Sequence, residues 1–304
     1  MRWALVLSGG GAKGFAHIGV LKALEELGMR PNLIVGTSMG AIVGGLYCSG
    51  MSVNELEEFA RNFDIDAYLE GFAYHVPDTI PFINIVRAGE AIKNLMTSTG
   101  MDGGRKLYEL FKKLTHDAKI EELKPSFCCN ALDLVSGEQR IFDSGSLADA
   151  MRASMSFPGI FSPWEIDGGL FVDGGIVDNM PVWAARKKGH THVIGVNVSP
   201  HEGIDREHIK KGLDVIMRSL VLVSTRIPRH IFNVADLEIV ASDATSQFDF
   251  GNPDKLIKLG YEKTMEKKKE IRMLVRPGLG RLLSGPNTIT RYIRKKLWEP
   301  DWKK

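Results

Sequence analysis

A serine flanked by glycines is the first feature of the chain whose residue types could do chemistry. The pattern G-x-S-x-G is centred on Ser38, in the run Gly36-Thr37-Ser38-Met39-Gly40. Glycines at these positions allow a sharp turn in which side chains would clash with the neighbouring strand and helix. Such a turn places the hydroxyl at the positive end of the following helix, where developing negative charge is favoured. The pattern predicts that Ser38 is a nucleophile; the alternative is an ordinary glycine turn with an incidental serine.

A second glycine-rich loop, residues 8–14, precedes this serine. Its glycines Gly9, Gly11 and Gly14 match the G-x-G-x-x-G pattern of dinucleotide sites. That function needs an acidic residue at the end of the second strand, where this chain has the serine turn, so the fingerprint fails. Backbone N–H groups of Gly9, Gly10 and Gly11 can instead converge on an oxyanion. The loop is therefore predicted to form an oxyanion hole.

A serine needs a base to take its proton. The chain has eight histidines, and a triad in the order Ser, Asp, His would admit His192 or His201, although neither lies in a recognisable motif. The stronger candidate is Asp173, which follows three apolar residues and precedes Gly174 and Gly175. A carboxylate in a dry site can act alone as the base. Asp173 is therefore the predicted base, with a turn-capping aspartate as the alternative.

Other polar residues are assigned structural roles. Asp178 and Asn179 are expected to serve as turn and cap residues. The three cysteines are expected to be buried thiols, and no His, Cys or acidic cluster has metal-ligand spacing. We therefore expect neither a metal nor a cofactor.

Alternating strands and helices must position these residues. The apolar run Ala4–Leu7 leads into the glycine loop and a helix that ends at Gly28; a second strand, Leu33–Val35, leads into the serine turn and the helix Ala41–Tyr47. This β-α-β-α order predicts an α/β fold with a parallel sheet and helices on both faces. Further expected strands and helices are Phe127–Leu134 and Arg140–Phe142 as a hairpin, the helix Val182–Lys188, the strands His192–Val198 and Leu237–Val240, and the helices 205–226 and 254–275.

The chain is expected to form one catalytic domain, residues 1–276, with a helical insertion or cap at 51–125 and a basic tail at 277–304. Residues 255–304 hold fifteen Lys and Arg against five Asp and Glu, although the net charge of the chain is only +2. The segment Thr288–Trp298 suits either an interfacial helix on anionic lipid or a helix docked on the body. No nucleic-acid-binding motif accompanies this charge. The absence of a signal-peptide core and of a spanning apolar run predicts a cytoplasmic protein, with peripheral contact at the inner membrane surface through the tail.

Three motifs together, Gly9 to Gly14, Gly36 to Gly40 and Asp173-Gly174-Gly175, resemble the patatin-like phospholipase family and its bacterial branch in order and spacing. The resemblance covers roughly residues 1–200. It implies a three-layer αβα sandwich around a mostly parallel sheet, and a Ser38–Asp173 dyad without histidine. It also implies that Gly9, Gly10 and Gly11 form the oxyanion hole, with Lys13 where the motif often has arginine.

By the same resemblance, the activity is hydrolysis of acyl esters of phospholipids, lysophospholipids or acylglycerols through an acyl-enzyme, without calcium. Two alternatives remain open at this point. An acyltransferase would use the same serine and the same oxyanion hole, with an alcohol in place of water. A non-catalytic lipid-binding regulator would keep the scaffold with a broken motif, and no motif is broken here. The sequence makes no prediction about the oligomeric state or the preferred head group.

Overall fold

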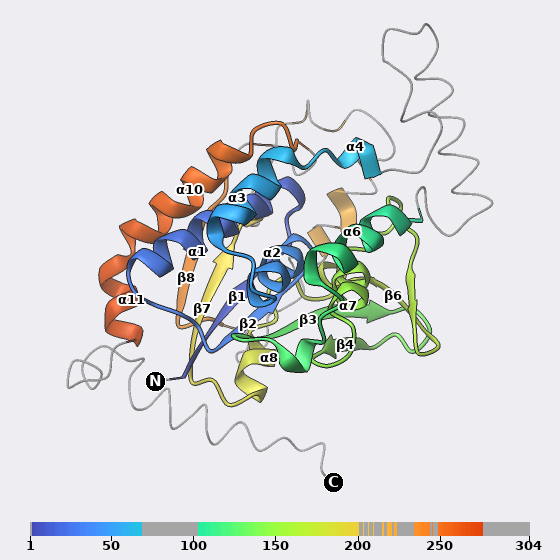
Figure 1. Ribbon diagram of the computed structural model, residues 1–304, viewed down its shortest axis with the longest axis horizontal. Coiled ribbons are helices and arrows are strands. Elements are labelled where there is room, and N and C mark those ends of the chain that lie inside the picture. Colours follow the sequence, from blue (N-terminus) through green and yellow to red (C-terminus); the bar gives the residue numbers. More distant parts are fainter. Residues whose placement is uncertain are drawn as a thin grey trace, which may run out of the picture.

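The computed structural model describes residues 2–68, 103–200, 234–243 and 249–275, with a few further residues between 203 and 245. The described strands form an eight-stranded sheet in which hydrogen-bonded neighbours follow the path β5-β6-β3-β2-β1-β7-β8 (Figure 1). Strands β6 and β2 pair with successive parts of one edge of β3, and β4 pairs with its other edge. The strands are β1 (Trp3–Leu7), β2 (Leu33–Gly36), β3 (Ser126–Asp133), β4 (Gln139–Phe142), β5 (Trp164–Ile166), β6 (Gly169–Asp173), β7 (His192–Asn197) and β8 (Leu237–Val240). The pairs from β3 through β2, β1 and β7 to β8 are parallel, whereas β4, β5 and β6 are added antiparallel. The predicted α/β class with a mostly parallel sheet is confirmed.

Helices cover both faces of this sheet. The helices of the described chain are α1 (Ala16–Glu26), α2 (Met39–Cys48), α3 (Val53–Asn62), α4 (Ile65–Tyr68), α6 (Arg105–Thr115), α7 (Leu147–Ser154), α8 (Val182–Lys187), α10 (Pro253–Glu266) and α11 (Lys268–Val275). Short 3₁₀ turns lie at Gly11–Phe15, Ile120–Glu122 and Gly174–Ile176.

The two faces of β1 belong to two separate hydrophobic cores. Successive side chains of a strand point to opposite faces. Leu5 and Leu7 pack in the larger core, which contains residues of α1, α2, α3, α7 and α10. Ala4 and Val6 pack in the smaller core with residues of α8, which lies apart from the other helices in Figure 1. The predicted sandwich of three layers is confirmed.

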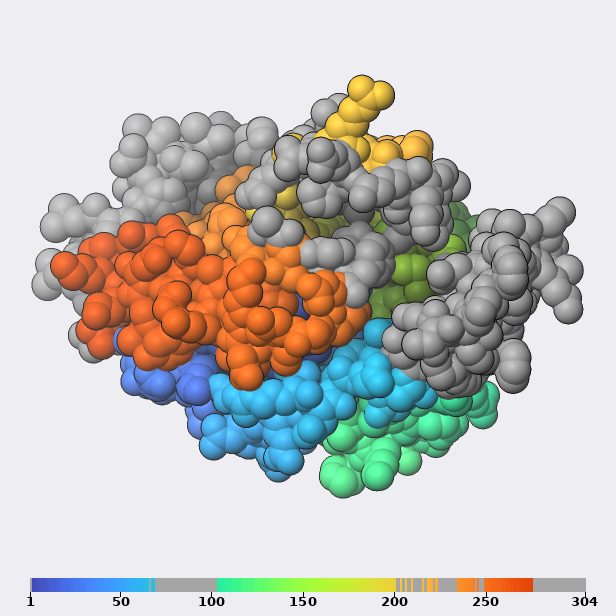
Figure 2. Space-filling model, turned by 90° about the horizontal axis from the view of Figure 1, so that it is seen from above, coloured from blue at the N-terminus to red at the C-terminus, as the bar shows by residue number. Residues whose placement is uncertain are grey.

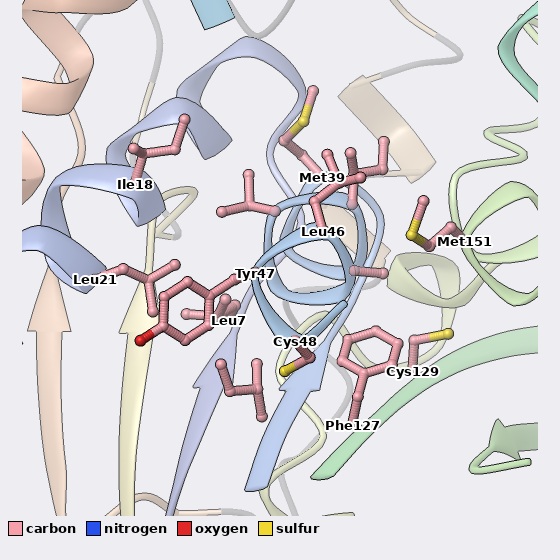
Figure 3. Close-up of a cluster of buried hydrophobic side chains, with 14 of the residues drawn as sticks. Leu7, Ile18, Leu21, Met39, Leu46, Tyr47, Cys48, Phe127, Cys129 and Met151 are labelled. Carbon is pink, nitrogen blue, oxygen red and sulfur yellow. The ribbon is translucent and has the colours of Figure 1, made fainter. Parts of the chain in front are cut away.

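Helix α2, which follows the serine turn, is buried along its whole length. Figure 3 shows Met39, Leu46, Tyr47 and Cys48 leaving this helix in different directions among other buried side chains. A Cβ on Gly45 would stand 2.6 Å from a methionine sulfur of α7. Because small residues let its neighbours approach, α2 packs between β1, β2 and α7. This enclosure fixes the start of the helix, where Ser38 lies.

The predicted insertion, residues 51–125, is helical where it is described. It contains α3, α4 and α6, and residues 69–102 lie outside the described part of the chain. Helix α3 begins with a capping box, in which Ser52 and Glu55 each bond the other's backbone N–H. Figure 2 shows α3 and α4, in cyan, between α10, in orange, and α6, in green. The division into a domain, an insertion and a tail remains a prediction.

Most other predicted elements are present within a residue or two, including the β3–β4 hairpin and β8. The helix predicted over 254–275 is two helices, α10 and α11, which meet at Lys267. The β5–β6 hairpin was not predicted. Most of the predicted helix 205–226 lies outside the described residues, as do all of the tail 277–304 and its segment Thr288–Trp298. The three cysteines are free and buried, as predicted. In the described part of the chain, no helix combines the length and apolar character needed to cross a bilayer.

Candidate active site

Ser38 lies at the junction of β2 and α2 in a strained backbone conformation. Its φ of 53° and ψ of −121° lie outside the regions that L-residues commonly adopt. Its N–H donates to Oγ of Ser154 at 3.0 Å, and its carbonyl oxygen accepts from the Ala41 N–H. A Cβ on Gly40 would overlap the carbonyl oxygen of Leu7 in β1, so glycine is required there. The structure thus contains the sharp strand-to-helix turn that the motif predicts.

Strand β3 brings the two predicted dyad residues together. Ala131 of β3 pairs with β4 on one edge and with Asp173 of β6 on the other. Cys129 likewise pairs with β4 and, on the opposite edge, with Gly36 of β2. Strands β2 and β6 therefore share one edge of β3, run in opposite directions, and end two residues apart along it, about 7 Å. The carboxyl ends of these two strands therefore meet. Ser38, two residues after the end of β2, lies beside Asp173, the last residue of β6.

Asp173 is buried beside the serine. Only 2% of the residue is exposed, and its Oδ1 accepts a hydrogen bond from the Gly175 N–H at 2.7 Å. Burial raises the pKa of the Asp173 carboxyl from 3.8 to about 6, although the neighbouring Ser38 hydroxyl and the Gly175 N–H oppose this rise. Its own N–H donates to the carbonyl of Ser156. Near neutral pH this carboxylate is ionised and is a stronger base than an exposed aspartate.

The glycine loop lies against the serine turn. A Cβ on Gly9 would stand 3.0 Å from the Cβ of Ser38, and Gly11 and Ser38 line the same cavity. One predicted role is not supported by this geometry: the Gly9 N–H does not face an oxyanion, because it donates to Oδ1 of Asn179 at 3.0 Å. Within the described residues, the N–H groups of Gly10 and Gly11 have no acceptor. These two amides are therefore the available donors of the loop.

The other motif glycines permit close approaches that a side chain would prevent. A Cβ on Gly14 would stand 2.5 Å from the Cβ of Met39, and one on Gly36 would stand 2.5 Å from the backbone of α2. A Cβ on Gly174 would meet the buried side chain of Asn130 at 2.5 Å. These glycines bring the loop, the turn and the end of β6 into one small volume.

Lys13 anchors the glycine loop to the segment that follows β8. Its Nζ donates to the carbonyl oxygen of Asp243 at 2.9 Å and lies 3.4 Å from Oγ of Ser242. The Asp243 carboxylate forms an ion pair with Lys255 at 2.7 Å. The lysine of this motif thus holds one end of the loop in place.

An apolar cavity of about 280 Å³ opens beside Ser38. Twelve of its fourteen lining residues are hydrophobic, and six of them are the phenylalanines Phe59, Phe63, Phe111, Phe157, Phe161 and Phe250. The ring of Phe63 lies 5.2–6.4 Å from the rings of Phe59, Tyr68, Phe250 and Phe15. Helices α3, α4 and α6 of the predicted insertion supply part of this wall, so the insertion shapes the space that a substrate would enter.

Neither His17 nor His192 is placed to act as the base. His17 is buried, its Nε2 bonds the carbonyl oxygen of Ser8 at 2.8 Å, and burial lowers its pKa to about 4. His192 pairs with Trp3 at the amino ends of the parallel strands, opposite the end where Ser38 lies. His201 lies outside the described residues. In the described chain, no group of three or more His, Cys, Asp or Glu side chains could hold a metal ion.

Comparisons with known proteins identify the family. The family model for patatin-like phospholipase matches residues 5–186, more than half of the chain. The chain belongs to the patatin-like phospholipase family. It is 35% identical to an uncharacterized NTE family protein of Mycobacterium tuberculosis over 181 residues, which is 60% of this chain and 44% of that protein. It is 32% identical to lysophospholipase NTE1 of Candida glabrata over 213 residues, 68% of this chain and 11% of that protein.

This member of the patatin-like phospholipase family therefore spans less than half the length of these curated relatives. Among solved structures it resembles VipD from Legionella pneumophila, with a TM-score of 0.53 and 18% identity over 88% of this chain and 67% of that chain. At this identity the resemblance concerns the fold alone. It agrees with the sheet and helix layers described above.

Three polar residues at this patatin-like site were not predicted to take part in it. Asn179, interpreted above as a turn residue, bonds the backbone of Gly9. Ser154 holds the Ser38 N–H, and Asn130 accepts a hydrogen bond from the threonine before Ser38 at 2.7 Å. Each hydrogen bond links residues at least 93 positions apart in the chain, so no local sequence pattern predicts it. Asp178 does serve the predicted turn, because its Oδ1 accepts from the N–H two residues later at 3.1 Å.

Proposed function

We propose that the chain is a serine lipid acyl hydrolase, which cleaves carboxylic esters of phospholipids, lysophospholipids or acylglycerols with the dyad Ser38 and Asp173. The observation that carries this proposal is the position of Ser38, on a strained turn and beside the buried Asp173 carboxylate, at the mouth of an apolar cavity. Acyl transfer through a covalent intermediate requires a nucleophile with its base close beside it, and this contact is often looser before substrate binds. Membership of the patatin-like phospholipase family supports the same chemistry.

The first half of the reaction forms an acyl-enzyme. Asp173 accepts the hydroxyl proton as Oγ of Ser38 attacks the ester carbonyl carbon, and the carbonyl oxygen becomes an oxyanion. The N–H groups of Gly10 and Gly11 stabilise this charge, and each such donor contributes about 10²–10³ in rate. When the tetrahedral intermediate collapses, the bond to the alcohol breaks, and Asp173 returns the proton to the departing oxygen.

The second half of the reaction frees the fatty acid. A water molecule takes the place of the alcohol and gives a proton to Asp173 as its oxygen attacks the acyl carbon. The same two amides hold the second oxyanion, and Oγ of Ser38 leaves with the proton from Asp173. Asp173 suits both steps because burial raises its proton affinity while leaving it ionised near neutral pH.

The cavity favours an acyl chain as the group that is transferred. Its wall is almost wholly hydrophobic, and at about 280 Å³ it lies near the lower limit of ligand pockets, about 300 Å³. This space suits one acyl chain, with the rest of the substrate outside. The Candida glabrata relative is named for the hydrolysis of lysophospholipids.

Probe labelling and product analysis test the proposal. A fluorophosphonate should label the wild-type chain but not Ser38→Ala, and Asp173→Asn should lose p-nitrophenyl ester turnover. His192→Gln is the matched control, because it changes a histidine at the opposite end of the sheet and should keep most of the activity. Labelling that survives in Ser38→Ala would exclude this nucleophile.

A panel of phospholipids, lysophospholipids and acylglycerols, with products identified by mass spectrometry, tests the substrate class. Release of free fatty acid supports a hydrolase. Acyl transfer to added glycerol or lysolipid in preference to water would instead support the acyltransferase.

A further inference from the structure

The side chain of Asn179 forms two hydrogen bonds with the backbone of Gly9, the first glycine of the predicted oxyanion loop. Its Oδ1 accepts the Gly9 N–H at 3.0 Å, and its Nδ2 donates to the Gly9 carbonyl oxygen at 3.2 Å. Because one amide atom faces a donor and the other faces an acceptor, the orientation of the side chain is fixed. The two residues are 170 positions apart in the chain.

The same side chain also lies next to the dyad. A Cβ on Gly175 would stand 3.0 Å from Oδ1 of Asn179 and 3.0 Å from Oδ1 of Asp173, so these two oxygens lie within about 6 Å of each other. A hydrogen bond from a neighbouring strand also holds the loop that carries Asn179. Nδ2 of the buried Asn130 donates to the carbonyl oxygen of Asp178 at 2.9 Å. Asn179 therefore projects from a fixed loop.

We propose that Asn179 is a positioning residue, which locks the glycine loop to the Asp173 loop and leaves Gly10 and Gly11 to bind the oxyanion. This inference rests on the proposed function. Consecutive glycines have the largest backbone freedom of any residues, and their ordering in the transition state would slow the reaction. A loop whose first residue is held by two hydrogen bonds has lost that freedom before the substrate arrives, so its amides are preorganised.

Two substitutions separate positioning from stability. Asn179→Ala removes both hydrogen bonds; kcat for a p-nitrophenyl ester should fall about ten- to hundredfold, while KM stays within about twofold. Asn179→Asp keeps the acceptor for the Gly9 N–H but places a carboxylate within about 6 Å of Asp173. The pKa of Asp173 is set by its burial, the Ser38 hydroxyl and the Gly175 amide. A second negative charge should therefore raise the midpoint of the pH–rate profile by about one to two pH units.

Asn32→Ala is the matched control, because Oδ1 of Asn32 accepts the Trp3 N–H at 3.0 Å at the opposite end of the sheet. It removes an equivalent bond and should leave kcat, KM and the pH midpoint unchanged. If the alanine variant at 179 does not fold, the nearly isosteric aspartate variant carries the test through its pH midpoint and kcat.

Wild-type values of kcat and pH midpoint in the Asn179 variants would overturn the inference. So would an equal loss of kcat in Asn32→Ala, which would show a general effect on folding. Ester turnover by the wild-type chain, abolished in Ser38→Ala, keeps the proposed function, so either result would then count against Asn179 alone. A wild-type chain that neither turns over the ester nor reacts with a fluorophosphonate overturns the proposed function, and this inference with it.

Discussion

Replacing Asp173 by asparagine should abolish the activity and stabilise the fold. The native carboxyl is buried, and its pKa lies at about 6 instead of the ordinary 3.8. A difference of about two pKa units corresponds to about 3 kcal/mol, because each unit is worth about 1.4 kcal/mol. Above pH 7 the wild-type chain bears this cost, since a buried carboxylate must stay ionised. An asparagine has no charge to bury, and its oxygen can still accept the Gly175 N–H.

The sign of the effect follows from proton linkage. Between pH 3.8 and about 6 the unfolded carboxyl ionises while the native one keeps its proton. The native state then binds more protons than the unfolded state, so the stability of the wild-type chain falls as pH rises through this window. Asp173→Asn removes this dependence. Its advantage over the wild type should be small near pH 4 and reach about 1–3 kcal/mol at pH 8.

Urea unfolding followed by tryptophan fluorescence, at pH 4 and pH 8, measures the difference in the free energy of unfolding. In the same samples, p-nitrophenyl ester turnover should fall about 10²–10⁴-fold. Asp133→Asn is a control of opposite sign, because hydrogen bonds from Val135 and Ser136 lower the pKa of that half-buried carboxyl. The reasoning is refuted if the Asp173→Asn advantage is the same at both pH values, since the native pKa would then be ordinary.

Three further predictions concern the same site and its supports. The kcat/KM of the wild-type chain should rise with pH, reach half its maximum near pH 6 as Asp173 ionises, and stay level above pH 7; a midpoint near pH 4 would contradict the burial of this base. Phe63→Ala should enlarge the cavity, so turnover of long-chain relative to short-chain p-nitrophenyl esters should increase severalfold, with a loss of stability of about 2–4 kcal/mol. An unchanged chain-length profile would show that this ring does not limit the acyl chain. Arg152→Lys should lower the free energy of unfolding by about 2–4 kcal/mol, because the buried guanidinium donates to three backbone carbonyl groups that one ammonium cannot reach together. A loss below about 1 kcal/mol in urea unfolding would contradict this assignment.

The sequence was informative wherever a local pattern has one structural solution. An apolar run followed by glycines and a helical segment predicts a strand, a tight turn and a helix, and β1, β2 and their helices follow that prediction. The β5–β6 hairpin was not predicted because its strands are only three and five residues long and show no clear alternation of apolar and polar residues. The break between α10 and α11 was not predicted because residues 266–270, Glu-Lys-Lys-Lys-Glu, contain no glycine or proline that would indicate the end of a helix. Short or continuous signals of this kind leave element boundaries undetermined.

The roles of the polar residues depended on contacts that no local pattern contains. Asn179 sits in a turn-like sequence, and its two bonds to Gly9 cross 170 residues. The same contact changes the predicted oxyanion hole, because it occupies the Gly9 N–H. A glycine run shows which backbone amides could bind an anion, but the partners already engaged with them are decided by the tertiary structure.

The meeting of Ser38 and Asp173 depends in the same way on the register of β6 along β3. Side chains alternate between the faces of a sheet, so a slip of one residue would turn the Asp173 carboxylate to the wrong face. Asp133 opposes such a slip, because its Oδ1 accepts the Val135 N–H of the β3–β4 turn at 3.0 Å and the Leu170 N–H of β6 at 3.1 Å. One half-buried carboxylate thus joins the turn to the start of β6. The position of the base is fixed at the far end of its strand as well as by the loop that follows it.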